Sequence, residues 1–466
     1  MTAIKFGTDG WRAIIAKDFT TDNVKRISMG VALYLKQKET EPSVVIGHDC
    51  RFAGELFMQT AASVFLAQGI KVHFAKGFVS TPMISLAAHE LQVSMGVIIT
   101  ASHNPPSYNG YKLKGNYGGP VLPFELELIE ALIPDAVPQV ADIELKDNGT
   151  TLFRQDLEAM YLKRVEDSFD LDAIRNSSMK FAYDAMYGAG QGVMKKLFPG
   201  MDLLHCDQNP GFEGTAPEPI LKNLKPFQEF IRSKGNIASG LATDGDADRI
   251  GLFDSKGNFV DSHHIILLLI HYLYKYKGYR GKVITAFSVT DKVKTLCAHY
   301  GLEQQTVKIG FKYIAGFFLE EDILLGGEES GGIAVKGHIP ERDGIWMGLI
   351  IWEFMAKSGK TLEELIEEVY AITGSFQYDR ADLHLTEEQK QRILKTCAGG
   401  NIQHFGGKDV ARTETIDGYK YHFNGGEWLM IRASGTEPVV RVYAEAADKT
   451  ELETFLQQSV KDVLAL

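Results

Sequence analysis

The chain has 466 residues, of which 45% are hydrophobic and 23% charged, the balance of an ordinary water-soluble globular protein. Its length predicts about three domains. Its net charge of −11 disfavours nucleic acid or a membrane surface as a partner, because both are polyanionic. A small anionic substrate stays compatible, because a local basic pocket can outweigh the global charge. The 46 glycines indicate many tight turns and close backbone approaches.

The four cysteines form no C-x-x-C pair. This disfavours a zinc ribbon or a disulfide scaffold and favours reduced thiols in the cytoplasm. Residues 1–6 contain no long apolar run, so we expect no signal peptide. No stretch of about 18 apolar residues occurs, so we expect no membrane span. The expected protein is cytoplasmic and binds neither a membrane nor nucleic acid.

Strand-like and helix-like segments alternate along most of the chain. Strands are expected at 43–47, 70–74 and 96–100, with a helix over 54–68. This order is typical of βαβ units in a mostly parallel sheet. The pattern returns twice, with expected strands first at 180–183, 201–205 and 240–243, and then at 250–253, 282–287 and 323–325.

The polar stretch 134–151 is the best candidate for a linker between the first two units. The end of the chain differs from the rest. Thr386 and Gln389 form a capping box that opens a helix, and Asp448 is expected to cap a final helix. Strands are expected at 419–423, 428–432 and 439–443. We therefore expect a smaller α+β domain from about residue 373.

The first unusual loop, residues 100–106, follows an expected strand and reads Thr-Ala-Ser-His-Asn-Pro-Pro. In open α/β sheets, ligands bind at the carboxyl ends of strands. Ser102 is a candidate nucleophile or phosphoryl carrier, with His103 and Lys112 as hydrogen-bonding or acid/base partners. Taken alone, a polar turn in which Ser102 bonds only the backbone has about equal weight.

The second loop, residues 243–249, carries Asp244, Asp246 and Asp248 at alternate positions, followed by Arg249. Three carboxylates that converge repel one another unless a cation lies between them, and Mg²⁺ takes oxygen ligands of this kind. The spacing does not fit an EF-hand. The alternative, an acidic solvent loop, is less favoured because strands flank the motif.

Three further loops are glycine-rich. Residues 326–332 offer Glu328, Glu329 and Ser330 as acceptors for sugar hydroxyls, against the alternative of a flexible turn. Residues 432–438 combine Arg432 with two hydroxyls and a free glycine N–H, which suits a phosphate dianion; a polar turn is the alternative. In residues 6–12 a glycine-flanked Arg12 next to a tryptophan could reach a phosphoryl group, although this segment taken alone favours a plain N-terminal turn.

Together, and in this order, the loops resemble the α-D-phosphohexomutase superfamily over essentially the whole chain, closest to the bacterial phosphoglucomutases and phosphomannomutases. The matching segments are 100–105, 244–249, 327–331 and 432–436. The resemblance implies an active site in a central cleft, and an α/β fold of three similar mixed domains with βαβ units and a smaller C-terminal α+β domain. The expected boundaries are 1–145 with the phosphoserine loop, 146–250 ending in the metal loop, 251–372 with the sugar loop, and 373–466 with the phosphate loop.

The resemblance also implies a role for each matching residue. Ser102 would carry the phosphoryl group and, with the three aspartates, hold one Mg²⁺ ion. His103 and Lys112 would be the acid/base candidates, and Arg12 and Arg249 would lie near the phosphoserine. Glu328 and Ser330 would contact the sugar O3 and O4. The phosphate that is not transferred would be bound by Arg432, Ser434, Gly435 and Thr436.

The implied reaction interconverts α-D-glucose 1-phosphate and glucose 6-phosphate through a hexose 1,6-bisphosphate, which is also the activator. The sugar loop has Glu329 and Gly332 where related loops often have glutamine or methionine and a histidine, and with residues 308–313 it is most similar to bacterial phosphoglucomutases. The alternatives are a phosphomannomutase or dual-specificity enzyme, a phosphoglucosamine mutase, and, in other classes, a Mg²⁺-dependent sugar phosphatase or an inactive sugar-phosphate sensor. A monomer and a homodimer are both compatible.

Overall fold

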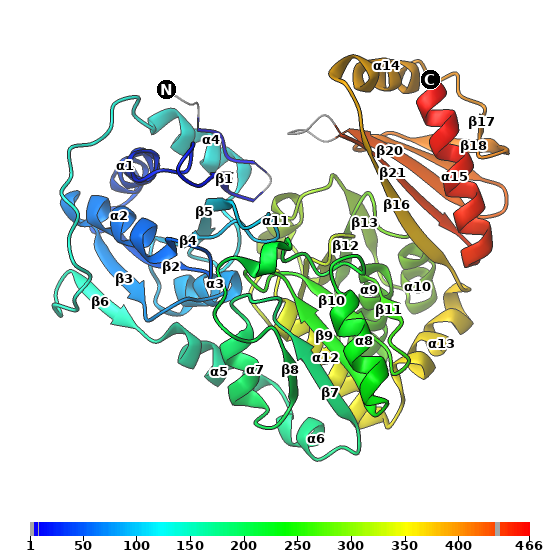
Figure 1. Cartoon of the computed structure of the whole chain (residues 1–466), viewed down its shortest axis with the longest axis horizontal. Coiled ribbons are helices and arrows are strands. Elements are labelled where there is room, and N and C mark those ends of the chain that lie inside the picture. The colour runs from blue at the N-terminus through cyan, green and yellow to red at the C-terminus, as the bar shows by residue number, and fades with distance from the viewer. Residues whose placement is uncertain (1–3, 8, 434–438) are drawn as a thin grey trace. The chain divides into compact units, whose positions relative to one another are not determined.

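The computed structural model of the protein describes residues 4–7, 9–433 and 439–466. The chain divides into two compact units. Figure 1 labels the helices and strands. Unit 1 comprises Met1–Ile284 and Gly310–Glu367, and unit 2 comprises Thr285–Ile309 and Glu368–Leu466. Among the described residues, every helix is too short or too polar to cross a bilayer.

Unit 1 begins with a six-stranded mixed sheet in the order β1-β5-β4-β2-β3-β6. Its strands are β1 (Trp11–Ile14), β2 (Ser43–His48), β3 (Lys71–Ala75), β4 (Met95–Ile99), β5 (Tyr108–Gly115) and β6 (Leu152–Gln155). Strand β2 is parallel to β3 and β4, and β3 is parallel to β6, whereas β5 runs antiparallel to β1 and β4. The expected βαβ rhythm is therefore present, but the antiparallel β5 brings Lys112 back beside the end of β4.

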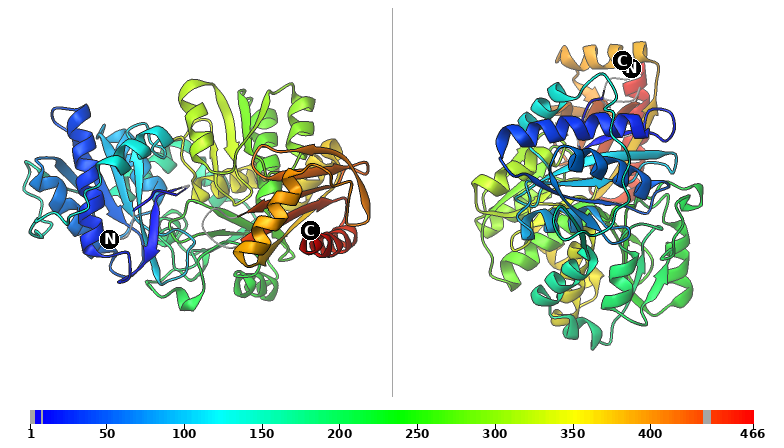
Figure 2. Two further views of the ribbon diagram at one scale, coloured as in Figure 1. Left: turned by 90° about the horizontal axis from the view of Figure 1, so that it is seen from above. Right: turned by 90° about the vertical axis from the view of Figure 1, so that its left-hand side faces the viewer.

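Four helices cover this first sheet: α1 (Thr21–Lys38), α2 (Gly54–Ala67), α3 (Thr81–Glu90) and α4 (Pro123–Leu132). Both faces of β2 are buried, as expected of a central parallel strand. Val44 and Ile46 belong to the core that α1 and α2 cover, and α1 crosses one face of the sheet in Figure 2. Thr20 and Ser80 cap α1 and α3 by accepting backbone N–H groups.

The second sheet of unit 1 has the order β11-β10-β9-β7-β8. Its strands are β7 (Lys180–Asp184), β8 (Asp202–Leu204), β9 (Ile237–Thr243), β10 (Ile250–Phe253) and β11 (Phe259–Val260). Strand β7 is parallel to β8 and β9, and β10 pairs antiparallel with β9. The helices of this region are α5 (Leu157–Ser168), α6 (Leu171–Arg175), α7 (Gln191–Leu197), η1 (Phe212–Gly214) and α8 (Lys225–Lys234).

Two of these strand pairings were not indicated by the sequence. Residues 250–253 were expected to open the third repeat, but β10 turns back on β9 and belongs to the second sheet. Strand β6, which follows the expected boundary after residue 145, pairs with β3 at the edge of the first sheet. In both cases a short apolar segment shows where a strand is, but its sequence does not show which neighbour it pairs with.

The rest of unit 1 contains α9 (Ser262–His271), the π-helix η2 (Tyr272–Tyr276), α11 (Lys312–Glu320), α12 (Gly344–Ser358) and the hairpin of β14 (Ile323–Gly327) and β15 (Ile333–Val335). A four-stranded sheet has the order β13-β12-β14-β15, with β12 (Lys282–Ala286) and β13 (Gln304–Val307). Helix α13 (Leu362–Thr373) follows α12 in the chain. The side chain of Asp343 caps α12 by accepting the N–H of Trp346.

Unit 2 is built on an antiparallel sheet in the order β16-β21-β20-β19-β18-β17. The elements are α10 (Lys292–Tyr300), β16 (Gln377–His384), α14 (Glu387–Ala398), β17 (His404–Phe405), β18 (Lys408–Glu414), β19 (Tyr419–Phe423), β20 (Trp428–Ala433), β21 (Val439–Ala446) and α15 (Lys449–Ala465). In β20, Leu429 and Ile431 join the core with α15, while Trp428 and Met430 pack with Phe287 on the other face. The Thr386 capping box and the Asp448 cap are confirmed.

Candidate active site

The turn after β4 holds Ser102 in a strained and buried conformation. Ser102 has a φ of 52°, a left-handed value that is uncommon for a residue with a side chain, and it is 0% exposed. Its N–H donates to Oγ1 of Thr100 at 2.9 Å, and that hydroxyl donates to Oδ2 of Asp49 at 2.5 Å. Such a conformation costs of the order of 1–3 kcal/mol and persists only where surrounding contacts enforce it.

Arg51 makes most of the contacts that hold the Ser102 turn in this conformation. Its buried guanidinium donates to four backbone carbonyls of the turn, at 2.6–3.0 Å: those of Ser102, Asn104, Pro105 and Tyr108. Its Nε lies 3.4 Å from Oδ2 of Asp49. One planar cation thus fixes the backbone from residue 102 to residue 108, as the forked geometry of arginine allows. No spacing pattern in the sequence indicates this role.

The aspartate loop between β9 and β10 meets this turn directly. The hydroxyl of Ser102 donates to Oδ2 of Asp244 at 2.7 Å, and Oδ1 of Asp244 accepts the N–H groups of Asp248 and Arg249. A Cβ atom at Gly245 would lie 2.5 Å from the carbonyl oxygen of Ser102. Only glycine therefore allows the two loops to approach so closely.

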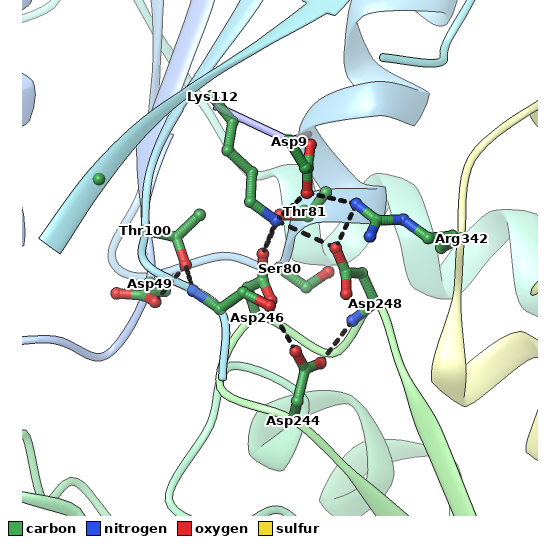
Figure 3. Close-up of polar contacts among 12 residues, drawn as sticks. Asp9, Asp49, Ser80, Thr81, Thr100, Lys112, Asp244, Asp246, Asp248 and Arg342 are labelled. Atoms are coloured by element: carbon green, nitrogen blue, oxygen red, sulfur yellow. Dashed lines mark hydrogen bonds and ion pairs between the residues drawn. The ribbon is translucent and has the colours of Figure 1, made fainter. Parts of the chain in front are cut away.

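The three loop carboxylates converge. Asp244, Asp246 and Asp248 are fully buried, and one oxygen of each lies within 4.8 Å of the others. Oδ2 of Asp246 accepts from Lys112 at 2.7 Å and from Thr81, and Oδ2 of Asp248 lies 2.7 Å from Arg342 (Figure 3). Oδ1 of Asp246 and Oδ1 of Asp248 are buried and, within the described part of the chain, have no hydrogen-bond partner.

Burying a carboxylate oxygen without a hydrogen-bond partner is costly, so each of these two oxygens requires a partner. Burial and repulsion by Asp246 and Asp248 raise the pKa of Asp244 well above its usual value. Burial also opposes the charge of Asp246, but the ammonium of Lys112 outweighs it and lowers the pKa of Asp246. The donor set of converging carboxylates fits a hard divalent cation such as Mg²⁺.

Lys112 lies at the centre of the acidic groups. Its Nζ is 2.7 Å from Oδ2 of Asp9, 2.7 Å from Asp246 and 3.0 Å from Asp248, and the side chain is 0% exposed. Burial alone would lower the pKa of Lys112, but these three carboxylates raise it above its usual value. Lys112 is therefore held as an ammonium ion. Asp9 was not predicted, although it lies in the same glycine-flanked segment as Arg12.

His103 and two arginines lie around the serine. Nδ1 of His103 is 3.3 Å from Oγ of Ser102, and Nη1 of Arg12 donates to Oδ1 of Asn104 at 2.7 Å. Burial, followed by the cations Arg249 and Arg12, lowers the pKa of His103 well below its usual value. The imidazole is therefore neutral near pH 7. These contacts connect the predicted groups to one another, either directly or through a common partner. The groups are Ser102, His103, Lys112, Arg12 and the aspartate triad.

The expected sugar loop is attached to the residue that follows the aspartate loop. The N–H of Ile250 donates to the carbonyl of Gly331 at 3.1 Å, and Arg249 and Gly332 form an isolated β-bridge. Glu328 is buried, and its Oε1 accepts the N–H of Gly310 at 2.8 Å. Burial raises the pKa of Glu328. Ser330 lies in the same turn and is partly exposed.

The expected phosphate loop begins in unit 2. Arg432 lies near the end of β20, and its Nε is 3.2 Å from Oδ2 of Asp417, which also accepts the N–H of Ile309 at 3.0 Å. The guanidinium is thus oriented by a carboxylate. Ser434, Gly435 and Thr436 lie outside the described residues.

Models of the phosphoglucomutase/phosphomannomutase family match the chain in four consecutive segments. Its α/β/α domains I, II and III match residues 3–138, 159–257 and 261–372, and its C-terminal domain matches residues 385–461. A phosphoglucomutase/phosphomannomutase of Thermococcus kodakarensis is 30% identical over 98% of this chain and 97% of its own. The chain belongs to this phosphohexomutase family. The four-domain α/β architecture and the predicted resemblance are thereby confirmed.

Other relatives of this phosphohexomutase differ in the sugar they are named for. A phosphoglucosamine mutase of Limosilactobacillus reuteri is 28% identical over 97% of this chain and 96% of its own. The crystal structure of a protein from Thermus thermophilus, provisionally named a phosphomannomutase, superimposes with a TM-score of 0.88 at 33% identity, covering 99% of both chains. Phosphohexomutases are intramolecular phosphotransferases of the isomerase class, so the predicted enzyme class is confirmed.

Proposed function

We propose that this phosphohexomutase interconverts α-D-glucose 1-phosphate and glucose 6-phosphate, with a phosphoryl group carried on Ser102. One observation carries the proposal: the strained, buried hydroxyl of Ser102 lies 2.7 Å from Asp244, one of three converging aspartates, and two oxygens of the other aspartates have no partner among the described residues. A hydroxyl fixed against a potential cation site is what a phosphoryl carrier needs. The Arg51 contacts keep this hydroxyl in place.

Asp244, Asp246 and Asp248 are the proposed Mg²⁺ ligands, together with the phosphorylated Ser102. When bound, the ion neutralises charge that develops on the phosphoryl oxygens. The chain contributes rigidity: Lys112, Thr81 and Arg342 contact Oδ2 of Asp246 and Asp248, and within the described residues Oδ1 of each is left available. Arg12 and Arg249 are the proposed phosphoryl-group contacts.

In the transfer, the bond between Oγ of Ser102 and phosphorus breaks, and a bond from a sugar hydroxyl to phosphorus forms. The hydroxyl proton must be accepted, and the serine oxygen must be stabilised as it leaves. His103, a neutral imidazole 3.3 Å from Oγ, suits proton acceptance. Lys112, held as an ammonium ion, suits stabilisation or proton donation. In the return step the bisphosphate presents its other phosphoryl group to Ser102. Such a reaction depends mainly on positioning and charge neutralisation.

Substrate binding is proposed to involve two loops. Glu328 and Ser330 would contact the sugar hydroxyls, and Arg432 with Ser434, Gly435 and Thr436 would bind the phosphate that is not transferred. The buried carboxylate of Glu328 keeps Oε2 for such a contact, because Oε1 already accepts Gly310. A guanidinium oriented by Asp417 can bind a phosphate in bidentate fashion.

The glucose preference rests on the sugar loop, in which Glu329 and Gly332 resemble bacterial phosphoglucomutases. Initial rates with glucose, mannose and glucosamine 1-phosphates test it, each with Mg²⁺ and the matching 1,6-bisphosphate. We expect the highest kcat/KM for glucose 1-phosphate. A higher value for mannose or glucosamine 1-phosphate would reassign the substrate, and release of inorganic phosphate in place of isomer would indicate a phosphatase.

A further inference from the structure

Arg342, two residues before α12, is a buried cation that none of the predicted motifs contains. Its side chain is 4% exposed. Its Nη2 lies 2.7 Å from Oδ2 of Asp248 and also contacts Asp9 (Figure 3). Its Nε lies 3.5 Å from Oε1 of Glu341. Because Asp9 also pairs with Lys112, this guanidinium belongs to the charge network of the serine and the aspartate loop.

The stem of Arg342 also packs directly on the sugar loop. A Cβ atom added to Gly332 would lie 2.4 Å from Cδ of Arg342 and 3.1 Å from its Cγ. The same Cβ would lie 3.6 Å from Oε2 of Glu328. The φ of Gly332 is not positive, so its backbone would accept a side chain. Glycine is therefore needed at 332 because Arg342 occupies the space.

Arg342 thus has one neighbour in each of three functional segments. These are Asp248 in the aspartate loop, Gly332 in the sugar loop, and Asp9 beside Lys112. Its guanidinium carbon also lies 5.4 Å from the ring centroid of Phe311. Burial raises the pKa of Glu328, and among the opposing charges that of Arg342 is the largest.

We propose that Arg342 is a positioning residue that sets the sugar selectivity of the enzyme by occupying the space beside Gly332. It keeps Glu328 in register with the aspartate loop, so that a hexose bound at Glu328 presents its hydroxyl to Ser102. The inference rests on the proposed function, in which Glu328 contacts the C3 and C4 hydroxyls of a hexose 1-phosphate. The discrimination that Arg342 controls is therefore between epimers at C3 or C4, and glucose and galactose 1-phosphates, which differ at C4, are the pair chosen to test it.

Gly332→Ala is the sharpest perturbation, because it leaves every charge in place and acts only by pushing Arg342 aside. We expect the KM for glucose 1-phosphate to rise about tenfold, and the preference for glucose over galactose 1-phosphate, as a ratio of kcat/KM, to fall about tenfold, which corresponds to the loss of one well-placed hydrogen bond. Gly316→Ala is the matched control, because its Cβ would make only an ordinary contact of 3.9 Å with Leu122. Unchanged selectivity in Gly332→Ala would overturn the proposal.

A double-mutant cycle separates this role from general destabilisation. Arg342→Ala should reproduce the loss of selectivity, and Gly332→Ala added to it should change KM by less than about twofold, because the new methyl group then meets no arginine. Equal effects of Gly332→Ala in both backgrounds would overturn the proposal. Melting temperatures and calorimetric binding of glucose 1-phosphate are recorded for each variant. If Arg342→Ala does not fold, the selectivity of Gly332→Ala alone decides whether the proposal holds.

The outcome for the wild-type enzyme distinguishes this inference from the proposed function. If the wild type isomerises none of the hexose 1-phosphates, the proposed function fails. If the wild type prefers glucose 1-phosphate and both single variants keep the same preference, only the role of Arg342 fails.

Discussion

The hydroxyl of Ser102 donates a hydrogen bond of 2.7 Å to Oδ2 of Asp244, a residue 142 positions further along the chain. The contact joins a turn at the end of β4 in the first sheet to a turn at the end of β9 in the second. Both are carboxyl ends of strands, where α/β sheets present their ligand sites. The proposed phosphoryl transfer depends on this contact, and its surroundings determine how the enzyme should respond to substitution.

Ser102→Ala should abolish isomerase activity, because among the described residues Ser102 supplies the one hydroxyl that donates to Asp244. Intact mass of the wild type after treatment with glucose 1,6-bisphosphate should show one added phosphate, and a peptide map should place it on Ser102. Ser107→Ala, at an exposed serine close by in the same loop, is the control and should behave as wild type. A phosphate mapped to any other residue would contradict the assignment.

Asp246→Asn should raise the Mg²⁺ dissociation constant at least tenfold (about 1.4 kcal/mol) and slow turnover by more, because the amide keeps the shape but not the charge. Isothermal calorimetry measures the affinity without relying on activity. Asp172→Asn, at an exposed aspartate of α6, is the matched control. If the two variants bind Mg²⁺ equally well, Asp246 is not a ligand.

Arg51→Lys should destabilise the fold by about 3 kcal/mol, because lysine cannot serve four carbonyls at once and leaves buried acceptors without partners. Denaturant unfolding measures the loss. Arg232→Lys is the comparison, because Arg232 is exposed and donates to only two carbonyls; its effect should stay within about 0.5 kcal/mol. Equal stability of the two variants would show that Arg51 does not hold the Ser102 turn.

Glu445 in β21 should make stability depend on pH. Burial raises the pKa of this carboxyl to about 7, from an ordinary value of 4.5. The folded state therefore binds the proton more tightly than the unfolded state, so stability falls as pH rises from about 4.5 through 7. Glu445→Gln should remove this dependence and gain up to about 3 kcal/mol relative to the wild type between about pH 5 and pH 8. A pH-independent difference between the two proteins would contradict the prediction.

Arg432→Ala should raise the KM for glucose 1-phosphate by about ten- to a hundredfold and lower kcat, because the reacting hydroxyl is no longer held in place. Arg432→Lys should recover only part of the loss, since an ammonium cannot form the bidentate contact. Arg392→Ala, at an exposed position of α14, is the control. An unchanged KM in both Arg432 variants would remove the C-terminal domain from substrate binding.

Much of the site could be predicted because its parts are short motifs at strand ends. The aspartate spacing and the Ser102 turn are visible in the sequence, as are the helix caps of unit 2. Asp9, Arg51, Thr81 and Arg342 could not be found in this way. Each acts through a partner far away in the chain, such as Asp248 for Arg342, and no local spacing encodes such a pair. Asp9 had the strongest available signal, since it shares its glycine-flanked segment with Arg12.

The sheet partners of short strands could not be predicted from the sequence either. The residues of β10 predict a buried strand correctly, but the tight turn formed by the aspartate loop sends the chain back along β9. That reversal places Arg249 against Gly332 and so brings the sugar loop to the aspartate loop. The sequence indicates the two motifs, and their closeness is a consequence of the antiparallel turn.

The most direct test follows glucose 1-phosphate by ³¹P NMR in the presence of the enzyme, Mg²⁺ and a trace of glucose 1,6-bisphosphate. We predict that the glucose 1-phosphate signal is replaced by that of glucose 6-phosphate with total sugar phosphate conserved, and that Ser102→Ala shows no conversion. Accumulation of inorganic phosphate in place of glucose 6-phosphate, or conversion that persists in Ser102→Ala, would contradict a phosphoryl transfer through Ser102.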